Sequence, residues 1–224
     1  MELFDTHAHY DDEAFDADRD AVLSALPEAG VSLVLDPGCD LPSSQRAAAL
    51  AEAYPHVYAA VGVHPEHCAD FGEAALSALR QLAARPKVVA IGEIGLDYYW
   101  EENPPREVQQ RAFRAQLALA LELDLPVIVH DREAHGDTLD ILEEFPQARG
   151  VLHCFSGSPE MARALAKKGW YFGFDGPVTY KNARKSLEAA AAVPRDRLLL
   201  ETDSPYLSPV PLRGRRNDSR SLPY

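Results

Sequence analysis

Histidine and carboxylate side chains follow several of the short apolar segments of this sequence. The first apolar segment runs into Asp5-Thr6-His7-Ala8-His9, and later ones run into Glu93, His130, His153 and Asp203. Residues two apart on an extended chain point to the same side, so His7 and His9 can aim both imidazoles at one point. Imidazole and carboxylate groups are ligands of divalent metals. Together these positions predict a metal centre.

The size of this ligand set indicates more than one ion. Four imidazoles and two carboxylates are too many for one tetrahedral zinc. They suit two divalent ions, about 3.5–4 Å apart, that share a carboxylate and clamp the attacking and leaving oxygens of a hydrolytic reaction. Nitrogen-rich ligation favours Zn, Mn, Fe, Co or Ni, and Mg stays open for a half-open site. Taken singly, each residue has a plainer interpretation, such as a hydrogen-bonded loop histidine, an ion pair of Glu93 with an arginine, or Asp203 capping a turn.

The elements that must position these residues alternate along the chain. Segments rich in Val, Ile, Leu and aromatic residues predict strands that are buried on both faces. They are 3–4, 32–35, 57–61, 88–91, 127–129, 151–152, 170–174 and 198–200. Helical periodicity and end signals predict helices between them. These cover 18–26, 42–53, part of 66–84, 106–123, 138–144, 158–168 and 182–192. Eight strands with seven intervening helices predict a parallel (β/α)8 TIM barrel as a single domain over residues 1–224, with its catalytic residues at the carboxyl ends of the strands.

The C-terminal end of the sequence does not complete this pattern. Only 24 residues follow Leu200, and four of them are proline, so no amphipathic eighth helix fits. We therefore expect either a barrel that lacks its C-terminal helix or helices, or a chain truncated there. Part of the first and eighth strands would then be uncovered, or covered by self-association.

Composition and charge exclude several classes of protein. The 224 residues carry a net charge of −13, which opposes tight non-specific binding to nucleic acid. There is neither a long apolar run nor a signal-peptide layout, and three cysteines without a C-x-x-C pair do not make a disulfide framework. These features favour a cytoplasmic protein without a membrane span. Residues 151–224 hold 12 basic and 7 acidic side chains, so we expect a less acidic rim on that side of the site. Bound divalent ions would add positive charge at the site, so we expect DNA affinity that is weak and that depends on the metal.

Seven motifs resemble those of the TatD family of metal-dependent deoxyribonucleases, in the amidohydrolase superfamily. In family order, they span residues 4–9, 62–65, 90–98, 126–130, 153–157, 201–207 and 213–217. By this resemblance, one ion is held by His7, His9, Glu93 and Asp203, and the other by Glu93, His130 and His153. The resemblance also implies that Glu93 bridges the ions and that Asp203 orients or deprotonates the attacking water.

The resemblance implies hydrolysis of DNA phosphodiester bonds by a metal-activated water, as an exonuclease on the 3′ ends of single strands. His64 matches a family histidine that faces the substrate phosphate, and Arg132 and Lys181 would add positive charge at the same rim. An alternative is hydrolysis of an acyl or amide bond, such as that of D-aminoacyl-tRNA, by the same dinuclear site. A second alternative is a metal-binding paralogue without activity. Asp175 departs from the small residues of many relatives, and it would either repel a phosphate or act as an outer hydrogen-bond partner.

Overall fold

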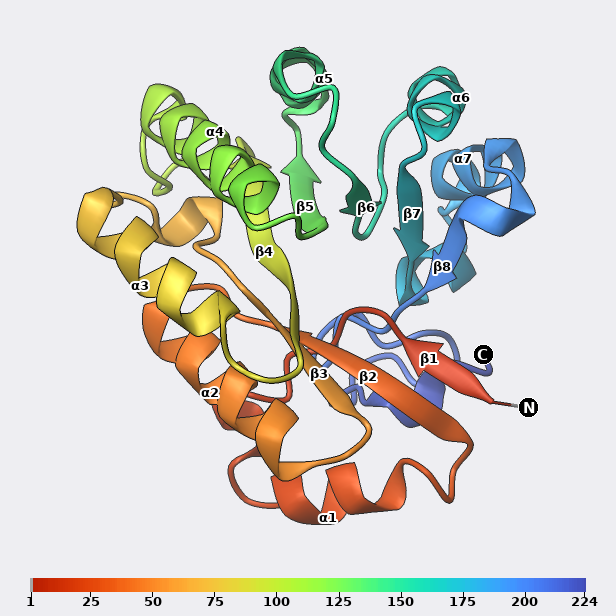
Figure 1. Cartoon of the computed structure of the whole chain (residues 1–224). Coiled ribbons are helices and arrows are strands. Elements are labelled where there is room, and N and C mark those ends of the chain that lie inside the picture. The colour runs from red at the N-terminus through yellow and green to blue at the C-terminus, as the bar shows by residue number, and fades with distance from the viewer. Residues whose placement is uncertain (1) are drawn as a thin grey trace.

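Eight parallel strands follow one another around a barrel, in the order of the sequence (Figure 1). The computed structural model describes residues 2–224. The strands are β1 (Leu3–Asp5), β2 (Val31–Pro37), β3 (Val57–Val61), β4 (Val88–Asp97), β5 (Val127–Arg132), β6 (Gly150–Leu152), β7 (Tyr171–Phe174) and β8 (Leu198–Leu200). The α-helices are α1 (Arg19–Ala25), α2 (Leu41–Ala53), α3 (Glu73–Ala83), α4 (Arg106–Glu122), α5 (His135–Glu144), α6 (Pro159–Lys167) and α7 (Arg184–Ala192). This alternation confirms the predicted (β/α)8 barrel.

The barrel is nearly closed between its first and last strands. The backbone amide of Thr6 donates to the carbonyl of Leu200 at 3.2 Å, and Ala8 forms a parallel bridge with Ser204. The amide of Asp203 donates to the carbonyl of His7 at 2.9 Å. These bonds bring the two ends of the sequence together, so residues 7 and 203 become neighbours at the carboxyl end of the barrel.

Local signals set most helix boundaries where the sequence predicts them. Ser158 caps α6 by accepting a hydrogen bond from the amide of Met161, Pro159 is its first residue, and Gly169 follows its end with φ +93°. Asp40 and Ser43 form a capping box at the start of α2. These caps start α2 and α6 directly after the segments that follow β2 and β6, which keeps those segments short.

Two strands extend well beyond their predicted ends. β5 continues to Arg132 rather than ending at Val129, and the difference is larger for β4. β4 continues from Val88 to Asp97 rather than ending near Ile91. Glu93 therefore lies within the strand rather than at its end, and Asp97 takes the terminal position. Pairing with β5 continues to Asp97, which lies opposite Arg132.

The apolar core has two parts, one inside the barrel and one outside it. The interior is small and consists of side chains such as Leu35, Ala60 and Ile128. The larger part lies between the strands and the surrounding helices, with Phe113 and Leu117 of α4 fully buried. Apolar side chains fill the lower barrel, and the polar residues of the site occupy its upper end.

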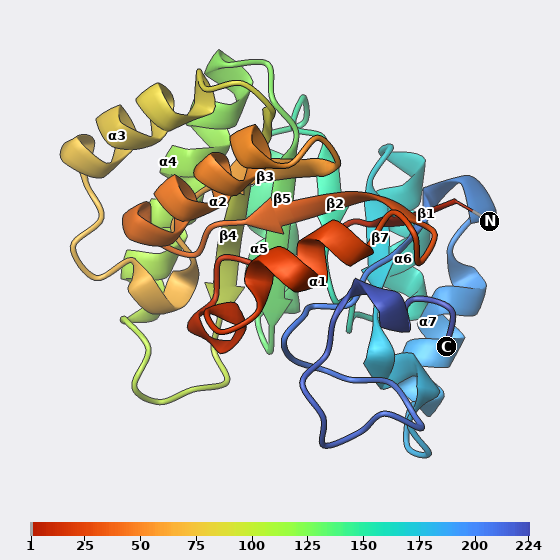
Figure 2. The same ribbon diagram turned by 90° about the horizontal axis from the view of Figure 1, so that it is seen from below.

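Within residues 2–224, no α-helix follows β8, in agreement with the sequence analysis. The C-terminal segment instead runs back beside α1 (Figure 2). The Arg216 guanidinium donates two 2.7 Å hydrogen bonds to the carboxylate of Asp18, and the Tyr10 hydroxyl donates to Ser219 Oγ at 2.8 Å. These contacts cover part of the flank of β1 and β8, while Leu200 and Phe4 stay 44% and 42% exposed.

Two expectations from the composition concern membrane spans and disulfide bonds, and the structure tests both. Among residues 2–224, no helix combines the length and the hydropathy needed to cross a bilayer. Cys39, Cys68 and Cys154 are free thiols, as expected from the odd number and spacing of the cysteines.

Candidate metal centre

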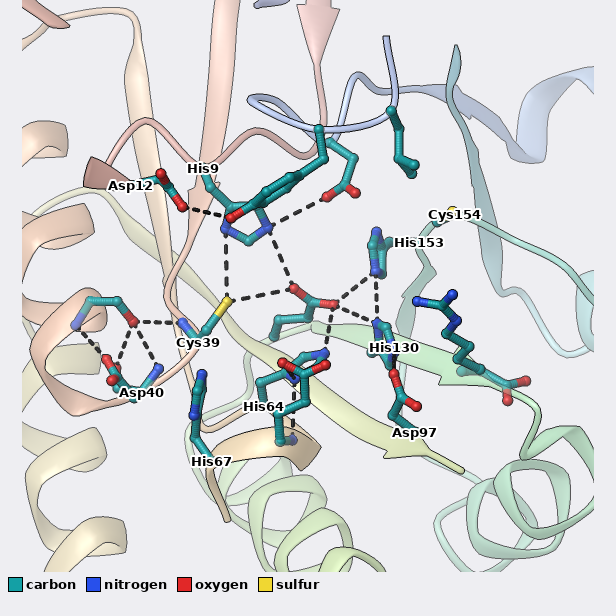
Figure 3. Close-up of a pocket in the computed structure, with 18 of the residues that line it drawn as sticks. His9, Asp12, Cys39, Asp40, His64, His67, Asp97, His130, His153 and Cys154 are labelled. Carbon is teal, nitrogen blue, oxygen red and sulfur yellow. Dashed lines mark hydrogen bonds and ion pairs between the residues drawn. The ribbon is translucent and has the colours of Figure 1, made fainter. Parts of the chain in front are cut away.

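The carboxyl ends of the strands surround one pocket of about 1130 Å³. Four histidines around it point toward one carboxylate, that of Glu93 (Figure 3). They are His9, His64, His130 and His153. The Glu93 side chain is only 4% exposed, so the charge that organises the site is buried beneath the pocket.

One group of side chains gathers at Glu93 Oε2. His7 Nε2 lies 3.3 Å and His9 Nε2 lies 3.6 Å from this oxygen. The same two nitrogens lie 3.7 and 3.5 Å from Asp203 Oδ1. The four residues that the resemblance assigns to one ion are therefore together.

A second group gathers at the other oxygen of the same carboxylate. His153 Nε2 lies 2.8 Å and His130 Nδ1 lies 2.9 Å from Glu93 Oε1. His64 Nε2 lies 3.5 Å from this oxygen, although the sequence assigns His64 to the substrate rather than to an ion. Glu93 is thus the residue common to both groups, as a bridging ligand must be.

The donor atoms fit divalent ions. His7 Nε2 and His9 Nε2 are 3.1 Å apart, and His130 Nδ1 and His153 Nε2 are 3.2 Å apart. Two nitrogens bound tetrahedrally to one zinc, each at 2.0–2.1 Å, would be about 3.3 Å apart. The other ring nitrogens of two histidines have acceptors, since His9 Nδ1 lies 3.0 Å from the Pro37 carbonyl and His130 Nε2 lies 3.0 Å from Asp97 Oδ2. Such outer contacts fix the tautomer that leaves a lone pair for a metal.

The electrostatics of the site also suit a cation. Burial alone would raise the pKa of Glu93, but the imidazoles of His153, His64 and His7 hold it well below its ordinary value. The carboxylate is therefore ionised. A buried ionised carboxylate between facing nitrogens is a good ligand set for a divalent ion.

Asp5 holds the ends of β1 and β8 in place behind the histidines. Its Oδ2 accepts a 2.6 Å hydrogen bond from the Thr202 hydroxyl, and its Oδ1 accepts from the amide of Thr202 at 3.0 Å and from that of His7 at 3.3 Å. Complete burial raises the pKa of Asp5 to about 7. This carboxyl fixes the backbone that carries His7 and Asp203, a role that sequence spacing did not reveal.

Three further residues of the site escaped the sequence analysis. Asp97 orients His130, Cys39 lies between His9 and Glu93, and Glu201 Oε1 lies 3.7 Å from His153 Nδ1. Asp97 and Glu201 each stand in a motif that the sequence shares with the family, which is the signal that could have found them. Their partners are more than 30 residues away in sequence, so only the closed barrel shows the contacts.

Another cluster lies behind His9. Asp11 and Asp36 have ligand atoms within 4.8 Å of each other and of His9, and all three residues are buried. Asp11 pairs with Arg46 at 3.1 Å, while neither carboxylate oxygen of Asp36 has a hydrogen-bond partner among the described residues.

The predicted substrate contacts are distributed differently from the metal ligands. His64 and Arg132 line the pocket, whereas Lys181 is exposed and is not among the lining residues. Asp175 is buried, and the nearby carboxylates of Glu201 and Asp203 add to burial in raising its pKa well above the ordinary value. Asp175 therefore does not present a negative charge to the pocket.

The charge of the pocket is uneven from one side to the other. Its lining includes ten acidic side chains and two basic ones, Arg46 and Arg132. Nine of the ten acidic side chains come from the first 150 residues, and Asp203 is the tenth. The side of the rim formed by residues 151–224 is therefore less acidic, as expected. The basic excess of that region is not the reason, since its lysines and arginines are not among the described residues that line the pocket.

A (β/α)8 barrel with two adjoining histidine–carboxylate groups at its strand ends has the fold and site of the metal-dependent hydrolases. The model of the family described as TatD related DNase matches residues 4–224. The chain belongs to this TatD family of metal-dependent hydrolases.

Individual relatives agree with this assignment. The chain is 44% identical over 224 residues to the uncharacterized metal-dependent hydrolase YabD of Bacillus subtilis, with 99% of this chain and 88% of YabD covered. It is 39% identical to the 3′-5′ ssDNA/RNA exonuclease TatD of Escherichia fergusonii, covering 99% of this chain and 88% of that one. The crystal structure of YJJV, a TatD homologue from Escherichia coli, has a TM-score of 0.91 and 36% identity, covering 98% and 86% of the two chains.

Proposed function

We propose that this protein is a two-metal hydrolase that cleaves phosphodiester bonds of DNA from the 3′ ends of single strands. One observation carries the proposal. The two oxygens of the Glu93 carboxylate face two different sets of imidazoles, at 3.3–3.6 Å on one side and 2.8–2.9 Å on the other. A bridging carboxylate of this kind is what a pair of catalytic ions requires.

The side chains divide into holding and reacting roles. His7, His9, Glu93 and Asp203 would hold one ion, and Glu93, His130 and His153 the other. When bound, two divalent ions lower the pKa of a water molecule and offset the charge that develops on the phosphoryl oxygens. Asp203 Oδ1 faces the first group, so this carboxylate is placed to orient the attacking water and accept its proton.

His64 is the best-placed substrate contact among the three that the sequence suggested. Burial and the neighbouring His130 lower the pKa of His64 well below its ordinary value, so the imidazole is neutral and can donate one hydrogen bond. It lies beside the Glu93 carboxylate and lines the pocket, which suits contact with a phosphate held there. Arg132 would supply positive charge from the same rim. Lys181 has a weaker case because it does not line the pocket.

The choice of DNA over another substrate rests on relatives. The E. fergusonii relative is named as a single-strand DNA and RNA exonuclease, while the B. subtilis relative is named only as a metal-dependent hydrolase. An acyl or amide bond, as in D-aminoacyl-tRNA, would use the same ligands and the same water.

The deciding experiment compares substrates on one preparation of the full chain. The protein is reconstituted separately with Mg²⁺, Mn²⁺, Zn²⁺, Co²⁺, Ni²⁺ and Fe²⁺, and metal content is measured. Each form is then incubated with 5′-labelled and 3′-labelled single-stranded DNA, with blunt duplex DNA, and with D-aminoacyl-tRNA. We expect mononucleotides to be released first from the 3′ end of single strands. Turnover of the aminoacyl ester alone would overturn the nuclease proposal and favour the alternative.

A separate proposal concerns self-association. The exposed side chains of Leu200 in β8 and Phe4 in β1 are apolar and lack a covering helix within residues 2–224. We propose that a second copy covers this flank in solution. Sedimentation equilibrium of wild type and of Leu200→Lys tests it, and a monomeric wild type over the micromolar range would contradict it.

A further inference from the structure

Two aromatic side chains stand at the mouth of the pocket with much of their surface in water. Trp100 is 43% exposed and Tyr206 is 54% exposed, and both line the pocket. The other tryptophan of the chain, Trp170, is only 3% exposed, within the core. Aromatic surface that is exposed inside a pocket can be buried by a ligand, and this burial is favourable.

The two aromatics come from opposite sides of the barrel. Trp100 follows β4, and Tyr206 follows β8. In an eight-stranded barrel in chain order, β4 and β8 are half a circumference apart. A ligand that crosses the mouth above Glu93 would therefore meet an aromatic surface on each side.

Both aromatic side chains are held in place by the protein. The Arg132 guanidinium lies 4.1 Å from the centre of the Tyr99 ring and 5.4 Å from that of Trp100, and the two rings meet edge to face at 4.7 Å. The Tyr206 hydroxyl donates a 2.8 Å hydrogen bond to Asp12 Oδ2. Rigid aromatic surfaces bind planar ligands at a low entropy cost.

The charge of the mouth indicates what part of a nucleic acid it can bind. With ten acidic and two basic side chains, the lining repels phosphates over most of its area, away from the metal centre and Arg132. One of the two arginines, Arg46, is already paired with Asp11. Affinity for the rest of the strand must then come from uncharged groups, and stacking of a base on an aromatic ring contributes about tenfold per base.

We propose that Trp100, supported by Arg132, and Tyr206 form two stacking subsites for unpaired nucleobases on opposite sides of the pocket mouth. This inference rests on the proposed function and adds how the substrate is recognised: by exposed base faces rather than by its phosphates. A duplex hides its base faces, so these subsites select single strands. Binding should also depend little on salt, unlike recognition through phosphates.

The test uses Trp100→Ala, Trp100→Phe and Tyr206→Ala in the metal-loaded full chain. Tyr171→Ala is the matched control because Tyr171 is also exposed, has an arginine (Arg197) 4.8 Å above its ring, and lies at the amino-terminal end of the barrel. Each variant is assayed on oligothymidylate and on oligomers in which single nucleotides near the 3′ end are replaced by an abasic tetrahydrofuran unit. Thermal melting shows that each variant is folded.

We expect the KM for oligothymidylate to rise about tenfold in Trp100→Ala and Tyr206→Ala, with a smaller change in kcat. Trp100→Phe should regain most of this loss, and Tyr171→Ala should behave as wild type. For wild type, an abasic unit at the nucleotide that stacks on one of these rings should raise the KM by a similar factor. On that abasic oligomer, the alanine variant of the same ring should raise the KM little further. Equal effects of the variants on intact and abasic substrates would overturn the inference.

A binding measurement separates failure of this inference from failure of the proposed function. A methylphosphonate-linked oligothymidylate keeps its bases but has a neutral backbone that this reaction does not cleave. It should quench the fluorescence of Trp100 in wild type and leave that of Trp170 in Trp100→Ala unchanged. Quenching without DNA hydrolysis would uphold the stacking subsites and refute the nuclease. Hydrolysis without quenching, and with a normal KM in Trp100→Ala, would refute the subsites alone.

Discussion

The two ends of the barrel are built from the same alternation of strands and helices, but they differ in the histidine and carboxylate side chains that they bring together. The carboxyl end surrounds a pocket of about 1130 Å³, at the base of which five histidines gather around Glu93. The amino end has a smaller pocket of about 460 Å³, lined by Glu2, Pro27, Gly30, Ser32, Leu33, Pro55 and His56. Among the described residues, the single histidine of this pocket, His56, belongs to none of the groups that could hold a metal. The chemistry of a histidine in this fold therefore depends on the end of the strand at which it stands.

Charges at the two ends are stabilised in different ways. At the amino end, Lys87 Nζ donates to the carbonyls of Ala51 at 2.7 Å and of Pro55 at 3.1 Å, where α2 ends. A cation at a helix C-terminus stabilises the fold by itself. At the carboxyl end, the buried carboxylate of Glu93 and the half-buried one of Asp203 lie among imidazoles whose nitrogens point at one another. A bound cation would stabilise this arrangement, which supports the proposal that the functional site lies at the carboxyl end.

The largest effect is expected from Glu93→Gln. The amide cannot bridge two ions, because its nitrogen has no lone pair for a metal, so DNA hydrolysis should fall by about 10³-fold or more. The bound metal, measured by elemental analysis, should fall with it. Glu52→Gln is the control, since Glu52 pairs with Arg85 at the amino end. If Glu93→Gln kept full activity, the carboxyl end would not be the catalytic one.

The second expectation concerns metal removal. Ions bound only by the folded protein stabilise it by about 2.7 kcal/mol per site at a concentration of 100 Kd. For a chain of this size, each kcal/mol raises Tm by about 2–4 °C, so with both proposed sites occupied the metal-loaded and chelated protein should differ by about 10–20 °C. Differential scanning calorimetry measures the shift. It should be much smaller in Glu93→Gln, and an equal shift in that variant would mean that the ions bind elsewhere.

The sequence predicted the features of both ends that depend on local signals. The Ser158 cap and Pro159 at the start of α6, and the apolar strand segments, act over a few residues. The carboxyl-end ligands were also predictable, because each stands directly after or within an apolar strand and the barrel brings those positions together. Their roles as ligands stay a prediction, although His7, His9, Glu93, His130, His153 and Asp203 lie where two ions require them.

The side-chain contacts that the sequence did not predict depend on closure of the barrel. The contact of His130 with Asp97 spans 33 residues, and that of Arg216 with Asp18 spans 198. The burial of His56, which is only 8% exposed beneath the start of β3, is a further consequence of this packing. Such side-chain pairings follow from where the helices pack, which periodicity does not specify.

The third prediction compares two glycines. A Cβ at Gly173 in β7 would collide with the carboxylate of Glu201, which accepts a hydrogen bond from the Cys154 amide and lies 3.7 Å from His153 Nδ1. Gly173→Ala should therefore displace His153 and reduce activity about 10- to 100-fold, as for loss of an outer contact to a metal ligand. The control is Gly136→Ala in α5, where a Cβ meets nothing within 4 Å.

Gly136→Ala should improve one property of the protein, its stability, whereas Gly173→Ala should impair another, its activity. Gly136→Ala should raise the free energy of unfolding by up to about 1 kcal/mol through helix propensity, with activity unchanged. Urea unfolding and initial rates give both quantities for each variant. An active Gly173→Ala with normal metal affinity would show that the Glu201 contact does not position His153.

The smallest effect is expected at the amino end, from His56. Burial lowers the pKa of this imidazole below its ordinary value of 6.5, a hydrogen bond with the Leu23 backbone opposes the shift, and Lys87 adds to it. Tyr54 is the other neighbouring ring, at 5.9 Å, and Glu2 lines the same pocket. The folded protein therefore favours the neutral form of His56, while the unfolded chain takes up a proton near pH 6.5.

The sign of the pH dependence follows from this difference. The stability that neutral His56 contributes is fully present above pH 6.5 and is lost as the pH falls through the lowered pKa of the folded state. His56→Gln removes this contribution, so the Tm difference between wild type and variant should narrow by about 1–2 °C between pH 8 and pH 5. Taking the difference at equal metal content cancels the larger titrations of the carboxyl end. A Tm difference that is constant with pH would mean that the lone histidine of the amino end titrates alike in the folded and unfolded chains.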